Sequence, residues 1–140
     1  MKLFNLYLFN VHGCNIFYRE WISLKTDESQ ENQGKLVHGM LVGLKALCSK
    51  LSPTENEIHS LTYHTSKYRL HYLESPTGLK IVLNTDHCTP SLIKELETVY
   101  KLYVEHVIKA PDFDPNERIR STIFSKNIDS WAQLLQETTK

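Results

Sequence analysis

Histidine and cysteine are the residue types of this chain that could hold a metal or serve as a nucleophile. The sequence has seven histidines and three cysteines. His59 and His64 lie five positions apart on one expected strand, so their side chains point to opposite faces. No HxH, HExxH or Cys/His set occurs at metal-ligand spacing. We therefore expect no metal site.

Two Cys–His neighbours are candidates for nucleophilic catalysis. His12 and Cys14 flank an expected turn, and His87 is adjacent to Cys88. A Cys–His nucleophile also needs an orienting third group and an oxyanion cradle, and residues adjacent in sequence rarely aim at one spot. The five glycines are scattered singly, so no phosphate-binding loop is present. We expect no catalytic residue and no cofactor.

Composition limits the remaining function classes. The 140 residues have the usual size of one domain, which we place at residues 1–140. Lys plus Arg and Asp plus Glu both total 16, so the chain lacks the positive excess that nonspecific nucleic-acid or lipid binding requires. Three cysteines without a CxxC pair indicate a reducing compartment. We expect a cytoplasmic protein that reaches a membrane only indirectly, through a partner.

Hydrophobic periodicity predicts the element order β-β-α-β-β-β-α-α. The expected strands are Leu3–Phe9, Cys14–Trp21, His59–Thr65, Tyr68–Glu74 and Leu79–Asn84. The expected helices run from Lys35 to Leu51, from an N-cap at Thr89 to Ala110, and from an N-cap at Asp114 through Leu135. Adjacent hairpins and a crossover helix predict an α+β fold, with helices on the faces of a mainly antiparallel five-stranded sheet.

Two turns carry specific signals. Gly13 supplies the positive φ that the first hairpin needs, and Ser75-Pro76-Thr77-Gly78 has Pro and Gly at the positions favoured by a type I turn. The polar stretch from Lys25 to Gly34 is expected to be a solvated loop.

The first expected helix has a broad apolar stripe with Gly39 and Gly43 on its flank. Two interpretations are open: the glycines let the helix approach a sheet closely, or they form a flat patch for a partner. The helices together are more hydrophobic than docking on one sheet face requires, so we expect part of that area to contact a partner.

Cationic side chains alternate with apolar ones in the stretch from Tyr63 to Asp86. Lys67, Arg69 and His71 should face one way and three large apolar residues the other. One interpretation is a half-exposed strand with its cations on the wet face. The other is a basic strip that steers an acidic partner protein, since the balanced total charge argues against a polyanion.

At these residues the chain resembles the sybindin-type (Bet-five-type) small subunits of the TRAPP tethering complex. The resemblance runs essentially end to end, with its most specific piece at Thr65–Tyr72. The other matching stretches are Asn5–Phe9 with Gly13, Tyr18, Trp21, Lys35–Leu36, Gly39–Leu41, Lys50–Pro53, Glu74–Gly78, Lys80, Asn84–Asp86, Tyr103–Glu105, Val107 and Ile128–Ser130.

The resemblance implies a longin-like fold with helices on both faces of the sheet. It also implies a core subunit that pairs with a second longin-type TRAPP subunit and contacts a palmitoylated α/β-type subunit. The assembled core of such complexes resembles a guanine-nucleotide exchange factor for Rab/Ypt-family GTPases in ER-to-Golgi traffic. A peripheral location at the cis-Golgi and endoplasmic reticulum follows, with no catalytic residue in the single chain.

We predict the partner contacts from the edge position expected for the second strand, from the first helix and from the basic strip, because an edge strand is a template for pairing. Lys45 and Lys50 are assigned to the GTPase side. The complete set is Ile16, Tyr18, Trp21, Met40, Leu44, Lys45, Lys50, Lys67 and Arg69.

Two alternatives from other classes remain open. A small sigma-type chain of a clathrin adaptor is also longin-like and similar in length, but the hairpin at Ser75–Gly78 and the strand before it favour the TRAPP interpretation. The other alternative is a free-standing enzyme that uses Cys88 or His87.

Overall fold

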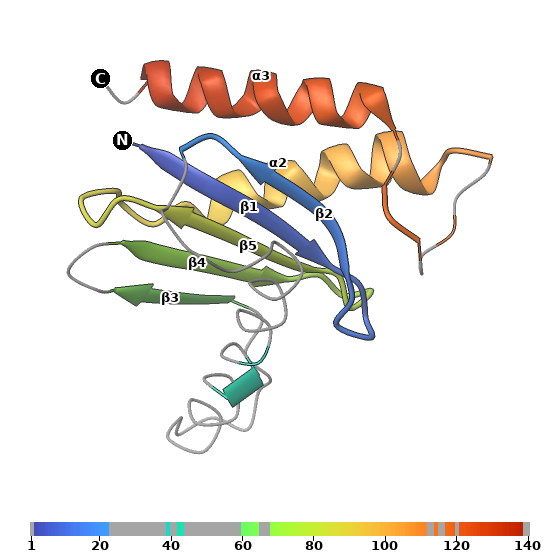
Figure 1. Ribbon diagram of the computed structural model, residues 1–140, viewed down its shortest axis with the longest axis horizontal. Coiled ribbons are helices and arrows are strands. Elements are labelled where there is room, and N and C mark those ends of the chain that lie inside the picture. Colours follow the sequence, from blue (N-terminus) through green and yellow to red (C-terminus); the bar gives the residue numbers. More distant parts are fainter. Residues whose placement is uncertain are drawn as a thin grey trace.

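Five strands form one fully antiparallel sheet in the order β2-β1-β5-β4-β3. Figure 1 shows this sheet in the computed structural model, which describes residues 2–22, 39, 42–43, 60–64, 68–111, 114, 117–119 and 121–138. The strands are β1 (Leu3–Phe9), β2 (Asn15–Glu20), β3 (Ser60–His64), β4 (Arg69–Glu74) and β5 (Lys80–Thr85). Each strand overlaps the range predicted for it from the sequence.

The two predicted turns are confirmed. Gly13 and Gly78 have φ angles of 84° and 89°, in the region that favours glycine. The backbone N–H of Gly78 donates to the Ser75 carbonyl oxygen at 3.0 Å, which closes the β4–β5 turn. In the β1–β2 turn, the Asn10 side-chain oxygen accepts from the backbone N–H of His12 and of Cys14. These bonds fix the register of both hairpins.

The described helices are α2 (Ile93–Tyr103), the π-helical segment η1 (Val104–Ile108) that continues it, and α3 (Thr122–Thr138). The predicted N-caps of both long helices are wrong. The Thr89 hydroxyl donates to the Asp86 carboxylate, and α2 begins after Leu92. α3 begins after Ser121, whose hydroxyl oxygen accepts from the Phe124 backbone N–H at 3.2 Å.

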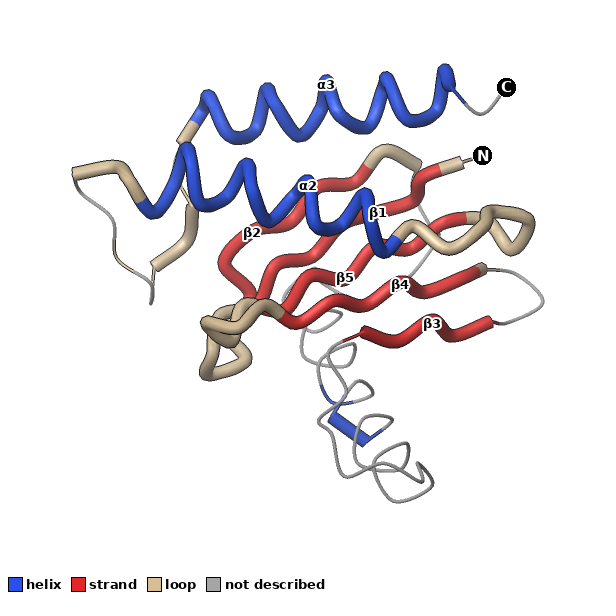
Figure 2. The backbone as a smooth tube through the Cα atoms, turned by 180° about the vertical axis from the view of Figure 1, so that it is seen from behind, coloured by secondary structure: helices blue, strands red, loops and turns tan. Residues whose placement is uncertain are grey.

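Both helices lie on the same side of the sheet, as Figure 2 shows. The core between them and the sheet contains Leu6, Leu8, Leu83, Leu96 and Phe124, all fully buried. The α+β, longin-like fold predicted from the sequence is confirmed, whereas a helix on the second face of the sheet stays a prediction, because both described long helices lie on one face (Figure 2). The helix predicted for residues 35–51 lies outside the described residues except for Gly39, Val42 and Gly43, which are helical. The loop predicted at 25–34 also lies outside them.

The other face of the sheet has its own apolar cluster. It contains Tyr7, Phe9, Leu70, Tyr72 and Val82, with Tyr18 and Tyr68 packed against it. The alternation predicted for β4 is therefore correct, because Leu70 and Tyr72 point to this second face while His71 points toward α2. The side chains of β2 are also divided between these two faces. A partner at this edge would therefore meet side chains on both faces.

Candidate functional site

β2 lies at one margin of the sheet, as predicted for the second strand. The Trp21 backbone N–H donates to the Phe4 carbonyl oxygen at 2.9 Å, so this residue hydrogen-bonds toward β1. Because bonding direction alternates along an antiparallel strand, the backbone groups of Tyr18 and Glu20 point away from the sheet. At the start of β2, the Ile119 N–H donates to the Ile16 carbonyl oxygen at 2.8 Å. Among the described residues, the open part of this edge therefore begins at Tyr18.

The side chain of Ile16 belongs to the core between sheet and helices, where it is 3% exposed. Its side chain is therefore not available to a partner, although the sequence places it in the expected interface. Tyr18 is half-buried on the second face, with its ring centroid 4.8 Å from that of Tyr7. Burial, followed by the nearby Tyr7 and Glu20, raises the pKa of Tyr18, so the hydroxyl stays protonated.

Trp21 and Arg19 point to the helix side and connect β2 to α3. The Arg19 guanidinium donates to both carboxylate oxygens of Asp129, at 2.8 and 2.5 Å. The Trp21 indole N–H donates to Asp129 Oδ1 at 3.4 Å, and its ring lies 6.4 Å from that of Trp131. This bidentate ion pair bridges the edge strand and α3.

A groove of about 490 Å³ runs between the end of β2 and α3. Its lining residues are Arg19, Trp21, Asp129, Ala132, Gln133, Gln136 and Glu137. The half-buried Trp21 therefore offers apolar surface beside the outward-pointing backbone groups of β2, which have no strand partner among the described residues. Tyr18 and Trp21, on opposite faces of the same edge, are the two predicted interface residues that the structure brings together.

The interpretation of β4 as an exposed basic strip is wrong for His71. This side chain is 0% exposed, with its Nε2 2.9 Å from Thr85 Oγ1, and its Nδ1 accepts from the Leu92 N–H at 3.4 Å. Burial, and then the charges of Arg69 and His64, lower the pKa of His71 to about 4, so the ring is neutral. Sequence alternation correctly separated His71 from Leu70 and Tyr72, but both interpretations of its face as exposed are wrong, because α2 covers that face.

Arg69 is also held within the fold. It is half-buried, and its guanidinium donates to the Thr89 carbonyl oxygen at 2.5 Å. Lys67, the remaining predicted member of the strip, lies outside the described residues. The structure therefore gives no support to an acidic partner docking along β4.

The predicted helix-one contacts Met40, Leu44, Lys45 and Lys50 lie outside the described residues. Gly39 and Gly43 are described, and a methyl group placed on either would meet no described residue within 4 Å. The described residues therefore give no support to a close approach of these glycines to the sheet. Val42, between them, is 53% exposed, which favours the interpretation of this surface as a patch for a partner.

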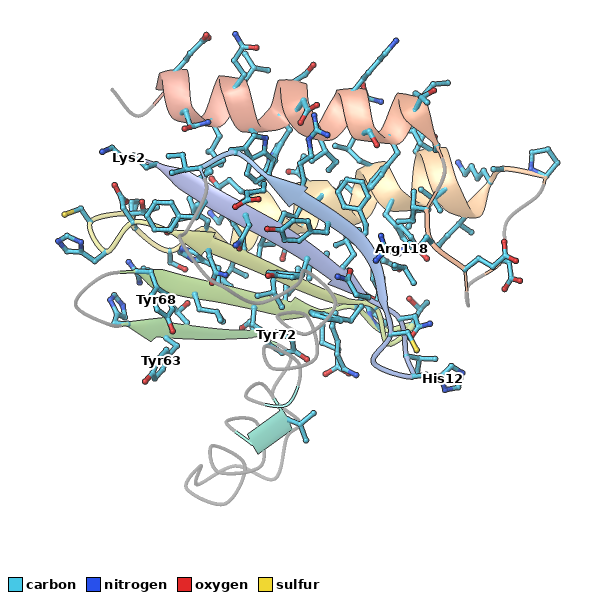
Figure 3. The ribbon with its side chains drawn as sticks, in the orientation of Figure 1. Lys2, His12, Tyr63, Tyr68, Tyr72 and Arg118 are labelled. Atoms are coloured by element: carbon cyan, nitrogen blue, oxygen red, sulfur yellow. The ribbon has the colours of Figure 1, made fainter. Side chains whose placement is uncertain are left out.

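The opposite margin of the sheet was not predicted as an interface. β3 is the second edge strand, and Tyr63 projects from it (Figure 3). The Ser75 N–H donates to the Leu79 carbonyl oxygen, which fixes the bonding alternation between β4 and β5. Residues of β4 bond alternately toward β5 and toward β3. This alternation places the backbone N–H and C=O groups of Thr62 at the outer edge of the sheet. The sequence shows that β3 exists but not that it lies at a margin.

Two classes of site are not seen in the part of the chain that the structure describes. No group of three or more His, Cys, Asp or Glu side chains is placed to hold a metal ion there. None of the described helices is long and apolar enough to cross a bilayer. Cys14 and Cys88 are exposed free thiols.

Comparison with known proteins identifies a family over nearly the whole chain. A model of the sybindin-like family matches residues 3–135. "Trafficking protein particle complex subunit 1" of Homo sapiens and of Rattus norvegicus are each 37% identical over 137 residues, covering 96% of this chain and 94% of theirs. "Trafficking protein particle complex subunit BET5" of Saccharomyces cerevisiae is 33% identical over 131 residues, covering 84% of this chain and 81% of its own.

Solved structures support the fold independently. MglB of Myxococcus xanthus superimposes with a TM-score of 0.51 at 16% identity, covering 69% of this chain and 74% of that one. At such low identity the likeness bears on architecture alone. It agrees with the five-stranded sheet and the helices described above.

Proposed function

This chain belongs to the sybindin-like family, and from that premise we propose that it is a core subunit of a TRAPP tethering complex in ER-to-Golgi vesicle transport. The observation that carries the proposal is the 37% identity to a trafficking protein particle complex subunit over 96% of the chain. The relative is matched over 94% of its own length, so the similarity covers a whole subunit.

Within such an assembly the chain would form part of a composite exchange platform for a Rab/Ypt-family GTPase. The platform would bind the GTPase with its switch segments displaced, and binding energy toward that open state would lower nucleotide and Mg²⁺ affinity. This mechanism needs contact surfaces rather than an acid, base or nucleophile. Lys45 and Lys50 remain our proposed contacts on the GTPase side.

The partners we propose are a second longin-type subunit and a palmitoylated α/β-type subunit. Tyr18 and Trp21 at the β2 edge offer backbone pairing flanked by two aromatic anchors, the residue types in which interface energy concentrates. The patch at Gly39, Val42 and Gly43 offers a second, apolar contact. The chain would work in the cytoplasm, peripherally at the cis-Golgi and endoplasmic reticulum, with its membrane contact supplied by the palmitoylated partner.

Mass spectrometry of the proteins that co-purify with the affinity-tagged chain from its native cells tests this role. We expect other TRAPP subunits in fixed ratio to the bait. Recovery of clathrin-adaptor large chains would instead support the sigma-type alternative, and recovery of the chain alone would contradict assembly.

Matched proline variants then identify the edge used. Glu20→Pro and Thr62→Pro each remove an outward-pointing N–H from one sheet margin and leave the bonds within the sheet intact. We expect Glu20→Pro and Trp21→Ala to reduce recovery of the second longin-type subunit and Thr62→Pro to leave it unchanged. The reverse pattern would assign the contact to β3 and refute the β2 assignment.

A further inference from the structure

Two carboxylates lie beside the open end of β2. Glu20 lies on the second face of the sheet, where its carboxylate is near the Tyr18 hydroxyl. Glu137 lines the groove on the helix side, where its carboxylate accepts from the Gln133 amide at 3.2 Å. The two carboxylates therefore flank the same stretch of strand edge, one on each face.

Neither carboxylate is paired with a cation within the described residues. Arg19, the cation that lines the groove, is already neutralised by both oxygens of Asp129. Counting only the residues that the structure describes, the edge therefore combines unpaired backbone N–H and C=O groups with uncompensated negative charge on each of its faces. An incoming strand with acidic side chains would be repelled there, whereas basic side chains would be attracted.

We propose that the groove between β2 and α3 binds an extended, basic segment of a partner protein by strand addition. Successive side chains of an added strand point to opposite faces, so two neighbouring Lys or Arg residues would meet Glu137 on one face and Glu20 on the other. The cation on the helix side also meets the half-buried ring of Trp21, which lines the same groove. Because Ile119 occupies the edge at Ile16, the added segment is confined to the part of β2 from Tyr18 onward.

This inference rests on the proposed function in one respect, since it names the chemistry of the segment that a partner would add to the β2 edge. Its test uses the full chain without any other subunit, so its outcome can be distinguished from that of the proposed function. Three fluorescein-labelled hexapeptides serve as probes: Thr-Val-Arg-Lys-Val-Thr, its acidic counterpart Thr-Val-Glu-Glu-Val-Thr, and the basic peptide with its central amides N-methylated. Fluorescence anisotropy measures the dissociation constant of each.

We expect the basic peptide to bind, the acidic peptide not to bind, and N-methylation to abolish binding because it removes the strand hydrogen bonds. Glu137→Gln should weaken binding of the basic peptide about two- to fivefold, in line with a solvent-exposed charge pair, and added salt should weaken it further. Glu97→Gln, an exposed carboxylate on α2, is the matched control and should have no effect.

Equal affinity for the acidic peptide, no effect of N-methylation, or no binding at millimolar peptide would each overturn the inference. The probes leave the protein unchanged, so a folding defect cannot produce these results. If the basic peptide binds but no TRAPP subunit co-purifies, the groove chemistry stands and the proposed function fails. If TRAPP subunits co-purify but no peptide binds, the proposed function stands and this inference fails.

Discussion

The buried His71 should make the fold lose stability as the pH falls from 7 to 5. Its ring is enclosed between the sheet and the start of α2, and it binds Thr85 and the Leu92 N–H. Protonation of Nδ1 would break the Leu92 bond and place a charge in an apolar environment beside Arg69. The experiment therefore changes the pH and compares the free energy of unfolding of the wild-type chain with that of His71→Gln.

The size of the effect follows from the two pKa values. Burial lowers the pKa of His71 from 6.5 in the unfolded chain to about 4 in the fold. The unfolded state therefore binds more protons between these values, and the free energy of unfolding rises with pH across that window. The full difference is about 3 kcal/mol, of which about 2 kcal/mol is lost between pH 7 and pH 5.

Urea unfolding followed by circular dichroism at the two pH values measures this loss. We expect His71→Gln to be less stable at pH 7 but to lose about 2 kcal/mol less than the wild type on going to pH 5. His87→Gln removes an exposed histidine and should behave like the wild type. Identical losses in the wild type and His71→Gln would refute the assignment of a neutral, buried His71.

Three further predictions concern a buried ring, an exposed ion pair and a turn glycine. Phe124→Ala removes a fully buried ring in edge-to-face contact with Phe17, at a centroid distance of 5.0 Å, and should lower the free energy of unfolding by about 3–5 kcal/mol; a loss below about 1 kcal/mol in urea titration would be inconsistent with that contact. A double-mutant cycle on Arg19 and Asp129 should give a coupling of about 1 kcal/mol or less, because both side chains are more than a third exposed, and a coupling well above that would show a stronger clamp. Gly78→Ala should cost about 1–3 kcal/mol, since φ is +89° and the new Cβ would lie 2.8 Å from Val11 Cγ2; an unchanged thermal midpoint would contradict this strain.

Local pattern was sufficient to predict the strands and their turns. The alternation in β4 and the glycines at 13 and 78 are short-range signals, and the structure has each of them in place. Simple alternation fails in β2, because the register shifts between Leu8 and Phe9 and both Ile16 and Phe17 pack into the core on the helix side, whereas Tyr18 lies on the other face. The N-cap predicted at Thr89 failed because the threonine hydroxyl has another local hydrogen bond available. Thr89 bonds to Asp86, and Ser121 takes the capping role for α3.

The site depended on contacts that no local pattern contains. Arg19 and Asp129 are 110 residues apart in sequence, and their ion pair exists only because α3 lies beside β2. The same applies to β4, where alternation separated His71 from its apolar neighbours but could not show that α2 buries the face on which it lies. Aromatic residue types were enough to propose Tyr18 and Trp21 as anchors, whereas the place of Glu137 in the groove follows only from the fold.

A nucleotide-exchange assay tests most directly our claim that this chain is a non-catalytic part of an exchange platform. The release of a fluorescent guanine nucleotide from the Rab/Ypt-family GTPase would be followed with the purified complete assembly, with the assembly lacking this chain, and with the chain alone. We expect fast release with the complete assembly and only the basal rate in the other two cases. Acceleration by the chain alone, or by an assembly that lacks it, would contradict the account.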